Sequence, residues 1–136
     1  MIGRIEPINH MNKRNVAVRL VVAAYALLMY VALSAPVYAR AHPHLDPVLL
    51  AEYARPWPVA LACSLAIVGI MLAVVPLQRG VTWAFWTSLS VLAILLATRT
   101  ATDPRCLVVV DPHQHGCHSF MIAIVLGVVG LLLSRR

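Results

Sequence analysis

The chain alternates between long apolar runs and short polar segments, and the polar segments hold almost all of its charged residues. Three runs, residues 20–39, 56–78 and 80–98, contain no Lys, Arg, Asp or Glu, and a shorter apolar run covers 119–134. A helix needs about 20 apolar residues to cross about 30 Å of hydrocarbon, where the backbone must satisfy its own hydrogen bonds. The pattern therefore predicts four transmembrane helices, at about 20–39, 57–77, 81–98 and 119–134.

The predicted fold class is all-α, an integral membrane bundle of four transmembrane helices. Residues 1–15 form a short N-terminal segment, and 16–136 form a single four-span domain. We expect a tight turn at 78–81, between the second and third helices. The prolines of segment 40–56 predict a stiff, extended connection there, because a residue before proline favours extended backbone.

Composition and charge agree with a membrane protein. Hydrophobic residues make up 61% of the chain and charged residues 12%, against about 25% charged residues in an ordinary soluble domain. The net charge of +6 is scattered between apolar runs, and no glycine-rich phosphate loop accompanies it. These features exclude nucleic acid as the expected partner and favour the lipid bilayer.

The distribution of basic residues predicts the orientation of the bundle. With four spans, the N-terminal segment, the second connection and the C-terminus share one face. That face holds one acidic residue and seven basic ones: Arg4, Lys13, Arg14, Arg19, Arg79, Arg135 and Arg136. The opposite face holds four basic and four acidic residues. By the positive-inside rule both termini are cytoplasmic, and the expected location is the bacterial inner membrane.

The first span has a second interpretation. Lys13, Arg14 and Arg19 precede an apolar run that ends in small residues, as in a secretory signal peptide. Cleavage after Ala41 would leave His42 as the new N-terminus. The run is longer than the 7–15 residues typical of such signals, which favours a retained helix.

Five of the six histidines fall in the two predicted outer connections. His42 and His44 lie in the first, and His113, His115 and His118 lie in the second. Imidazoles near carboxylates and a thiol are ligands that copper or zinc prefers. The spacing matches no zinc-finger or zincin motif, so a copper or zinc site and ordinary solvated loop histidines both remain open.

Cys106 and Cys117 share the second outer connection, where an oxidising environment favours a structural disulfide. Three other states stay open for this pair: metal ligation by Cys117, redox activity and free thiols. Cys63 lies within the second span and is expected to be a packing residue.

The predicted spans contain no ionisable residue at depth, and we assign no catalytic residue. Small residues recur at helix-packing spacing in the pairs Ala62 with Ala66, Gly69 with Ala73, Ala93 with Ala97 and Gly127 with Gly130. The leading hypothesis is a non-enzymatic accessory, assembly or structural subunit that contacts other membrane protein subunits. The alternatives are copper or zinc binding or transport at the outer face, and a membrane thiol–disulfide oxidoreductase.

Overall fold

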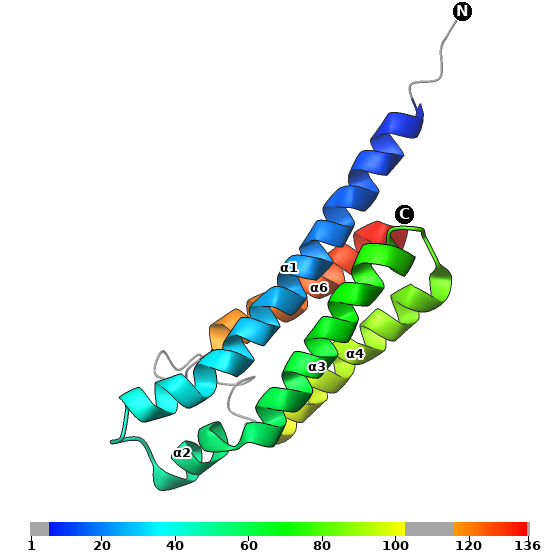
Figure 1. The fold of residues 1–136 in the computed structure, drawn as a ribbon. Coiled ribbons are helices and arrows are strands. Elements are labelled where there is room, and N and C mark those ends of the chain that lie inside the picture. The colour runs from blue at the N-terminus through cyan, green and yellow to red at the C-terminus, as the bar shows by residue number, and fades with distance from the viewer. Residues whose placement is uncertain (1–5, 103–115, 136) are drawn as a thin grey trace, which may run out of the picture.

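The computed structural model describes residues 6–102 and 116–135, which are helical almost throughout (Figure 1). Four segments are long and apolar enough to cross a membrane: Asn12–Ala41, Pro56–Leu77, Thr82–Ala101 and Cys117–Arg135. This confirms the predicted all-α, four-helix architecture of an integral membrane protein, and the described part of the chain contains no strand. In chain order the elements are α1 (Glu6–Ala41), α2 (Pro47–Ala54), α3 (Pro56–Leu72), a π-helical turn η1 (Ala73–Leu77), α4 (Thr82–Thr102) and α6 (Cys117–Arg135).

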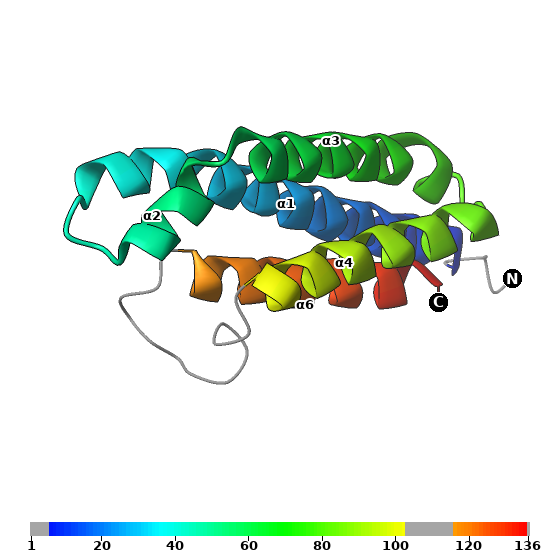
Figure 2. The ribbon, with the colours of Figure 1, turned by 90° about the horizontal axis from the view of Figure 1, so that it is seen from below.

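The four long helices lie side by side in one bundle (Figure 2). Helix α1 packs along α6 and α3, and α4 packs against α6 and α3. The start of α1 and the end of α6 lie at the same end of the bundle (Figure 1), as an even number of spans requires. We call this the proximal end and the opposite one the distal end.

Helix α1 is longer than the predicted span 20–39. Its 36 residues extend over about 54 Å at 1.5 Å per residue, so α1 projects beyond the bundle at the proximal end (Figure 1). The segment between Glu6 and Arg19 has one helix breaker, Pro7, which is tolerated in the first turn because no N–H is needed there. The apolar pattern therefore marked the membrane-crossing part of a longer helix.

The predicted tight turn at 78–81 is present and ends the continuous α3–η1 helix. Pro76 lacks an N–H and would crowd a regular α-helical turn, and the wider π-helical turn η1 accommodates it. Gly80 then adopts φ +73°. Its N–H donates to the carbonyl of Leu77 at 3.0 Å, and the N–H of Val81 donates to that of Pro76 at 3.0 Å. These two bonds form a Schellman motif, which satisfies carbonyls at the helix end.

The prediction of an extended first connection is wrong for part of segment 40–56, because residues 47–54 form helix α2. Asp46 Oδ1 accepts a hydrogen bond of 2.9 Å from the N–H of Val48, as an N-capping side chain does. Pro47 follows at the first helical position, where its fixed φ suits a helix. The Asp-Pro pair therefore starts a helix here, whereas the proline content alone had indicated extended backbone.

Glycines bring α1 and α6 into close contact. A Cβ atom on Gly130 would lie 2.8 Å from Val21 Cγ2 and 3.0 Å from the Ala17 carbonyl oxygen. A Cβ atom on Gly127 would lie 2.8 Å from a Leu92 methyl group of α4. Lipid tails are as apolar as the helices, so tight packing of this kind replaces the hydrophobic effect as the source of helix association. The predicted pairing of Gly127 with Gly130 is thus part of the bundle core.

Tyr25 connects three helices in the middle of the bundle. Its side chain on α1 is fully buried, and its hydroxyl donates a hydrogen bond of 3.0 Å to the Ser88 carbonyl oxygen on α4. The ring lies against Gly69 of α3, where a Cβ atom would overlap it. The Tyr25 ring therefore leaves room only for glycine at position 69. The hydrogen bond to Ser88 satisfies the Tyr25 hydroxyl inside an apolar environment.

We expect Gly69→Ala to destabilise the bundle by about 1–3 kcal/mol, because the added methyl overpacks the Tyr25 ring. The cost should shrink by at least about 1 kcal/mol in a Tyr25→Leu background, which removes that ring. A double-mutant cycle by thermal unfolding in detergent measures this coupling. Equal costs in the two backgrounds would contradict the contact.

Candidate functional site at the distal end

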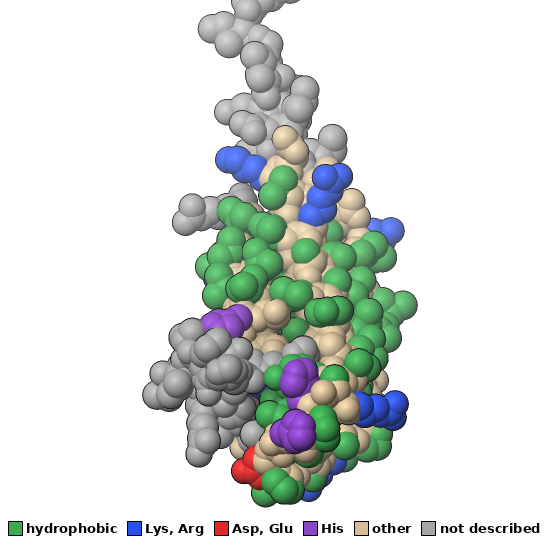
Figure 3. All heavy atoms as spheres, turned by 90° about the vertical axis from the view of Figure 1, so that its left-hand side faces the viewer, with side chains coloured by type: hydrophobic (Ala, Val, Ile, Leu, Met, Phe, Trp, Pro, Cys, Tyr) green, Lys and Arg blue, Asp and Glu red, His purple; other side chains and the backbone are tan. Residues whose placement is uncertain are grey.

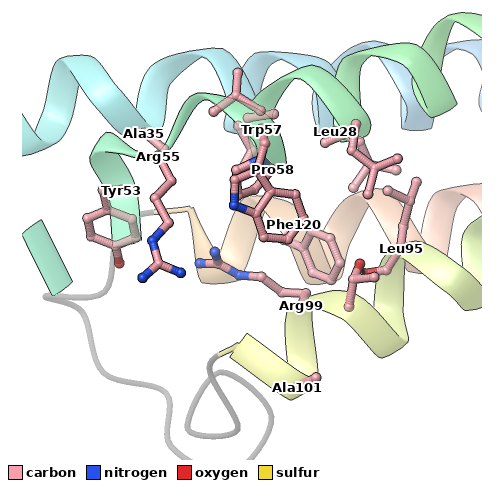
Figure 4. A pocket seen from close by; sticks show the side chains of 16 residues that line it. Leu28, Ala35, Tyr53, Arg55, Trp57, Pro58, Leu95, Arg99, Ala101 and Phe120 are labelled. Carbon is pink, nitrogen blue, oxygen red and sulfur yellow. Dashed lines mark hydrogen bonds between the residues drawn. The ribbon is translucent and has the colours of Figure 1, made fainter. Parts of the chain in front are cut away.

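A pocket of about 360 Å³ lies near the distal end, between the long helices and α2 (Figure 4). Its volume falls within the range of small-molecule sites. Its floor consists of side chains from the bundle core: Leu28, Val31, Leu95 and Phe120, each at most 9% exposed. The floor is therefore apolar and closed.

The pocket opens between α3 and α4. Trp57 and Leu61 of α3 line it and are 60% and 44% exposed, and Thr98 and Ala101 of α4 line it and are also exposed. Leu61 lies one helical turn deeper in the span than Trp57, so part of this opening is at membrane depth. The pocket is thus accessible from the side of the bundle.

Two arginines stand at the distal rim of the pocket. Arg55 directly precedes α3, and Arg99 lies near the end of the α4 span. Figure 4 shows their guanidinium groups extending toward one another, beside Tyr53. Among the described lining residues none is acidic. The pocket therefore combines an apolar interior with two arginines at its rim.

Sequence reasoning missed this pocket. The predicted third span ended at residue 98, which left Arg99 in a connection, whereas α4 continues to Thr102 and buries the Nε atom of Arg99. The available signal was helical spacing: Arg99 follows the buried Leu95 by four residues and therefore lies on the same face.

The described histidines of the predicted cluster lie toward the distal end, among hydrophobic side chains (Figure 3). The His42 ring stacks on Tyr38 with ring centroids 4.1 Å apart, and its Nδ1 lies 3.1 Å from the Tyr38 carbonyl oxygen. His44 is exposed in the connection from α1 to α2. His113 and His115 lie outside the described residues. The described ranges, 6–102 and 116–135, contain no group of three potential metal ligands.

Cys117 and His118 are adjacent in the sequence, and both are candidate metal ligands. Cys117 is 5% exposed in the first turn of α6, whereas His118 is exposed. Adjacent helical residues do not face each other, so these two side chains point in different directions. Of the carboxylates near the histidines in the sequence, Asp46 caps α2, and Asp111 lies outside the described residues.

Two of the three cysteines, Cys63 and Cys117, lie among the described residues. Cys63 is a free thiol within α3. Cys117 is not a free thiol, but its predicted partner Cys106 lies outside the described residues. Gly116 precedes Cys117 with φ +79°, and a Cβ atom there would lie 2.7 Å from Val31 Cγ1. The start of α6 is therefore held close to α1.

Comparisons with protein-family models, with curated proteins and with solved structures found no match to this chain.

Non-reducing mass spectrometry tests the predicted disulfide. We expect a Cys106–Cys117 crosslink together with an alkylatable Cys63. Replacing Cys106 by Ser should lower stability in detergent by about 2–3 kcal/mol, the contribution expected for closing a loop of this length. Cys63→Ala is the matched control and should leave the crosslink intact. Alkylation of both loop cysteines without prior reduction would contradict the pairing.

Proposed function

We propose that this protein is a non-enzymatic accessory or assembly subunit of a membrane complex, with its distal end on the outer face of the bacterial inner membrane. The observation that carries the proposal is the outward face of α4. Ser90, Ala93 and Ala97 lie on this face and are exposed in the single chain. Small residues allow two transmembrane helices to approach closely, so this face suits a helix of a partner subunit.

The other small-residue pairs are used within the chain, which distinguishes the α4 face. Gly127 and Gly130 are buried in the bundle core, as are Gly69 and Ala73. The same spacing on α4, in Ala93 and Ala97, faces outward. A helix of a partner subunit would pack against Ala93 and Ala97, as helices of this chain pack against the buried small-residue pairs.

Hydroxyl groups on the α4 face fit either lipid or protein surroundings. Ser90 Oγ donates a hydrogen bond of 2.9 Å to the Trp86 carbonyl oxygen, and Thr87 Oγ1 donates one of 2.9 Å to that of Trp83. Because each hydroxyl already donates to its own helix, the face carries no unmet donor. Its oxygen atoms can still accept a bond from a neighbouring helix.

The proximal part of α4 is anchored at the level expected for the cytoplasmic interface. Trp83 and Trp86 are 57% and 54% exposed, and tryptophan is enriched at membrane–water interfaces. The Arg135 guanidinium of α6 lies 5.6 Å from the Phe85 ring centroid and 5.8 Å from that of Trp86, within cation–π range. These contacts fix the α4 face relative to the bundle.

A photo-crosslinking side chain at Ile94, which is 50% exposed on the same face, tests the accessory role. We expect one adduct of discrete mass with a different membrane protein. The Ala93→Leu/Ala97→Leu double variant should reduce that adduct about fivefold or more, because larger side chains keep the helices apart.

Ala23→Leu/Ala26→Leu is the matched control, since both alanines are exposed on α1, and it should leave the adduct unchanged. Crosslinking to lipid alone would contradict the proposal. An adduct with a second copy of this chain would contradict it as well.

Copper or zinc binding at the distal end is a second candidate, favoured by the geometry of His42. A hydrogen bond from Nδ1 to the Tyr38 carbonyl oxygen would leave Nε2 as the ligating atom, an arrangement that holds many metal-binding imidazoles in place. His44 lies two residues away and is exposed. His113, His115 and His118 are the remaining proposed ligands.

Calorimetry on the chelator-treated protein tests the metal site. We expect Cu(II) or Zn(II) to bind tighter than about 10 μM and more weakly below about pH 6.5, because neutral imidazole is the ligand. His42→Ala/His44→Ala and His113→Ala/His115→Ala should each weaken binding. His10→Ala, which precedes the first span, is the control. Unchanged binding in both double variants would show that these histidines hold no metal.

A further inference from the structure

The distal pocket has two features that suit different parts of one ligand. Its interior is apolar and closed by buried core side chains, among them Leu28, Leu95 and Phe120. Its rim carries the guanidinium groups of Arg55 and Arg99 (Figure 4). An apolar interior favours a hydrocarbon chain, and a pair of guanidinium groups favours an anion. The matching ligand is an anionic amphiphile.

The level of the arginines in the membrane identifies the anion. Arg55 directly precedes the span that begins at Pro56, and Arg99 lies two residues before the span end at Ala101. Both therefore lie at the boundary between hydrocarbon and headgroups, where lipid phosphates are found. Guanidinium groups bind phosphate oxygens in a bidentate manner. Basic pockets between transmembrane helices are a known way to hold anionic headgroups.

The position of the pocket entrance indicates how a ligand would reach the interior. Exposed lining residues of α3 and α4, including Trp57 and Leu61, flank the entrance, and this entrance reaches membrane depth. An acyl chain already in the bilayer can enter sideways without crossing water. Trp57 stands at the rim, as aromatic side chains do at the interface. A ligand from the lipid phase thus fits the entrance better than one from solution.

Existing contacts of the arginines are compatible with a bound phosphate. Arg55 and Arg99 both already have interaction partners in the chain. Each guanidinium has five N–H donors, so a phosphate can add to these contacts.

We propose that the distal pocket binds one anionic phospholipid, with an acyl chain between α3 and α4 and the phosphate at Arg55 and Arg99. The pocket lining does not include Ala93 or Ala97. Variants at Ala93 and Ala97 therefore test the partner surface on α4, and variants at Arg55 and Arg99 test the lipid site.

Native mass spectrometry of the full chain, purified and stripped of lipid in detergent, measures binding. We expect the first phosphatidylglycerol to bind about tenfold tighter than phosphatidylcholine, whose headgroup has no net charge. Arg99→Gln and Arg55→Gln should each remove most of this preference. Arg40→Gln is the matched control: it makes the same charge change at the distal end of α1, outside the pocket lining, and should retain the preference.

A second pair of variants tests the apolar interior. Ala62 lines the pocket and Ala60 does not, although both lie on α3. Ala62→Phe should fill the pocket and weaken phosphatidylglycerol binding about tenfold, whereas Ala60→Phe should not. Thermal unfolding of each variant in detergent confirms that it is folded. Phosphatidylglycerol with brominated acyl chains should quench wild-type tryptophan fluorescence, and Trp57→Phe should remove most of that quenching while Trp83 and Trp86 remain.

Three results would overturn the proposal. Equal affinity for the two phospholipids would show that the rim does not select an anion. Equal effects of Arg99→Gln and Arg40→Gln would show that the preference comes from general surface charge. Glycerol phosphate binding as tightly as phosphatidylglycerol would assign the site to a small soluble phosphate, because the acyl chain would then contribute nothing.

Discussion

The Tyr25 side chain is the constraint on which the bundle depends. Surrounded by lipid, the helices gain little from burying apolar surface against one another, so close packing and hydrogen bonds must hold them together. The Tyr25 ring fills the space beside Gly69 on α3, and its hydroxyl bonds the Ser88 carbonyl on α4. One side chain of α1 thereby fixes the positions of α3 and α4. Leu28, one turn farther along α1, then forms part of the pocket floor.

Hydropathy predicted the number and order of the membrane helices, since a bilayer imposes length and apolarity on each span. It predicted helix ends less well. Helix α1 extends far beyond its apolar run because the basic residues Lys13, Arg14 and Arg19 interrupt the apolar pattern without breaking the helix. Small-residue spacing predicted the contact at Gly127 and Gly130 but gave the same signal for Ala93 and Ala97, which are exposed. The spacing of small residues shows that another helix can approach a given helix closely. Whether a helix of the same chain occupies that face depends on the fold.

The candidate site was less accessible to sequence reasoning than the fold. Histidine and cysteine spacing predicted a metal site and a disulfide in the outer connections, and of the proposed metal ligands the structure describes His42, His44 and His118. The pocket could not be anticipated as a whole, because its lining comes from five helices and extends in the chain from Leu28 to Phe120. Its charged rim joins Arg55 and Arg99, which the sequence presents as the boundaries of two different spans. Such a site follows from the packing of the helices and from no local motif.

The close pairing of α1 with α6 has a consequence for biosynthesis. These are the first and last long helices, and Gly130 meets Ala17 and Val21 across their interface. During translation α1 enters the membrane long before its main neighbour has been synthesised. Until α6 is present, Ala17 and Val21 of α1 lack the neighbour that packs against them in the finished bundle. Packing of the bundle core is therefore completed only when α6 inserts.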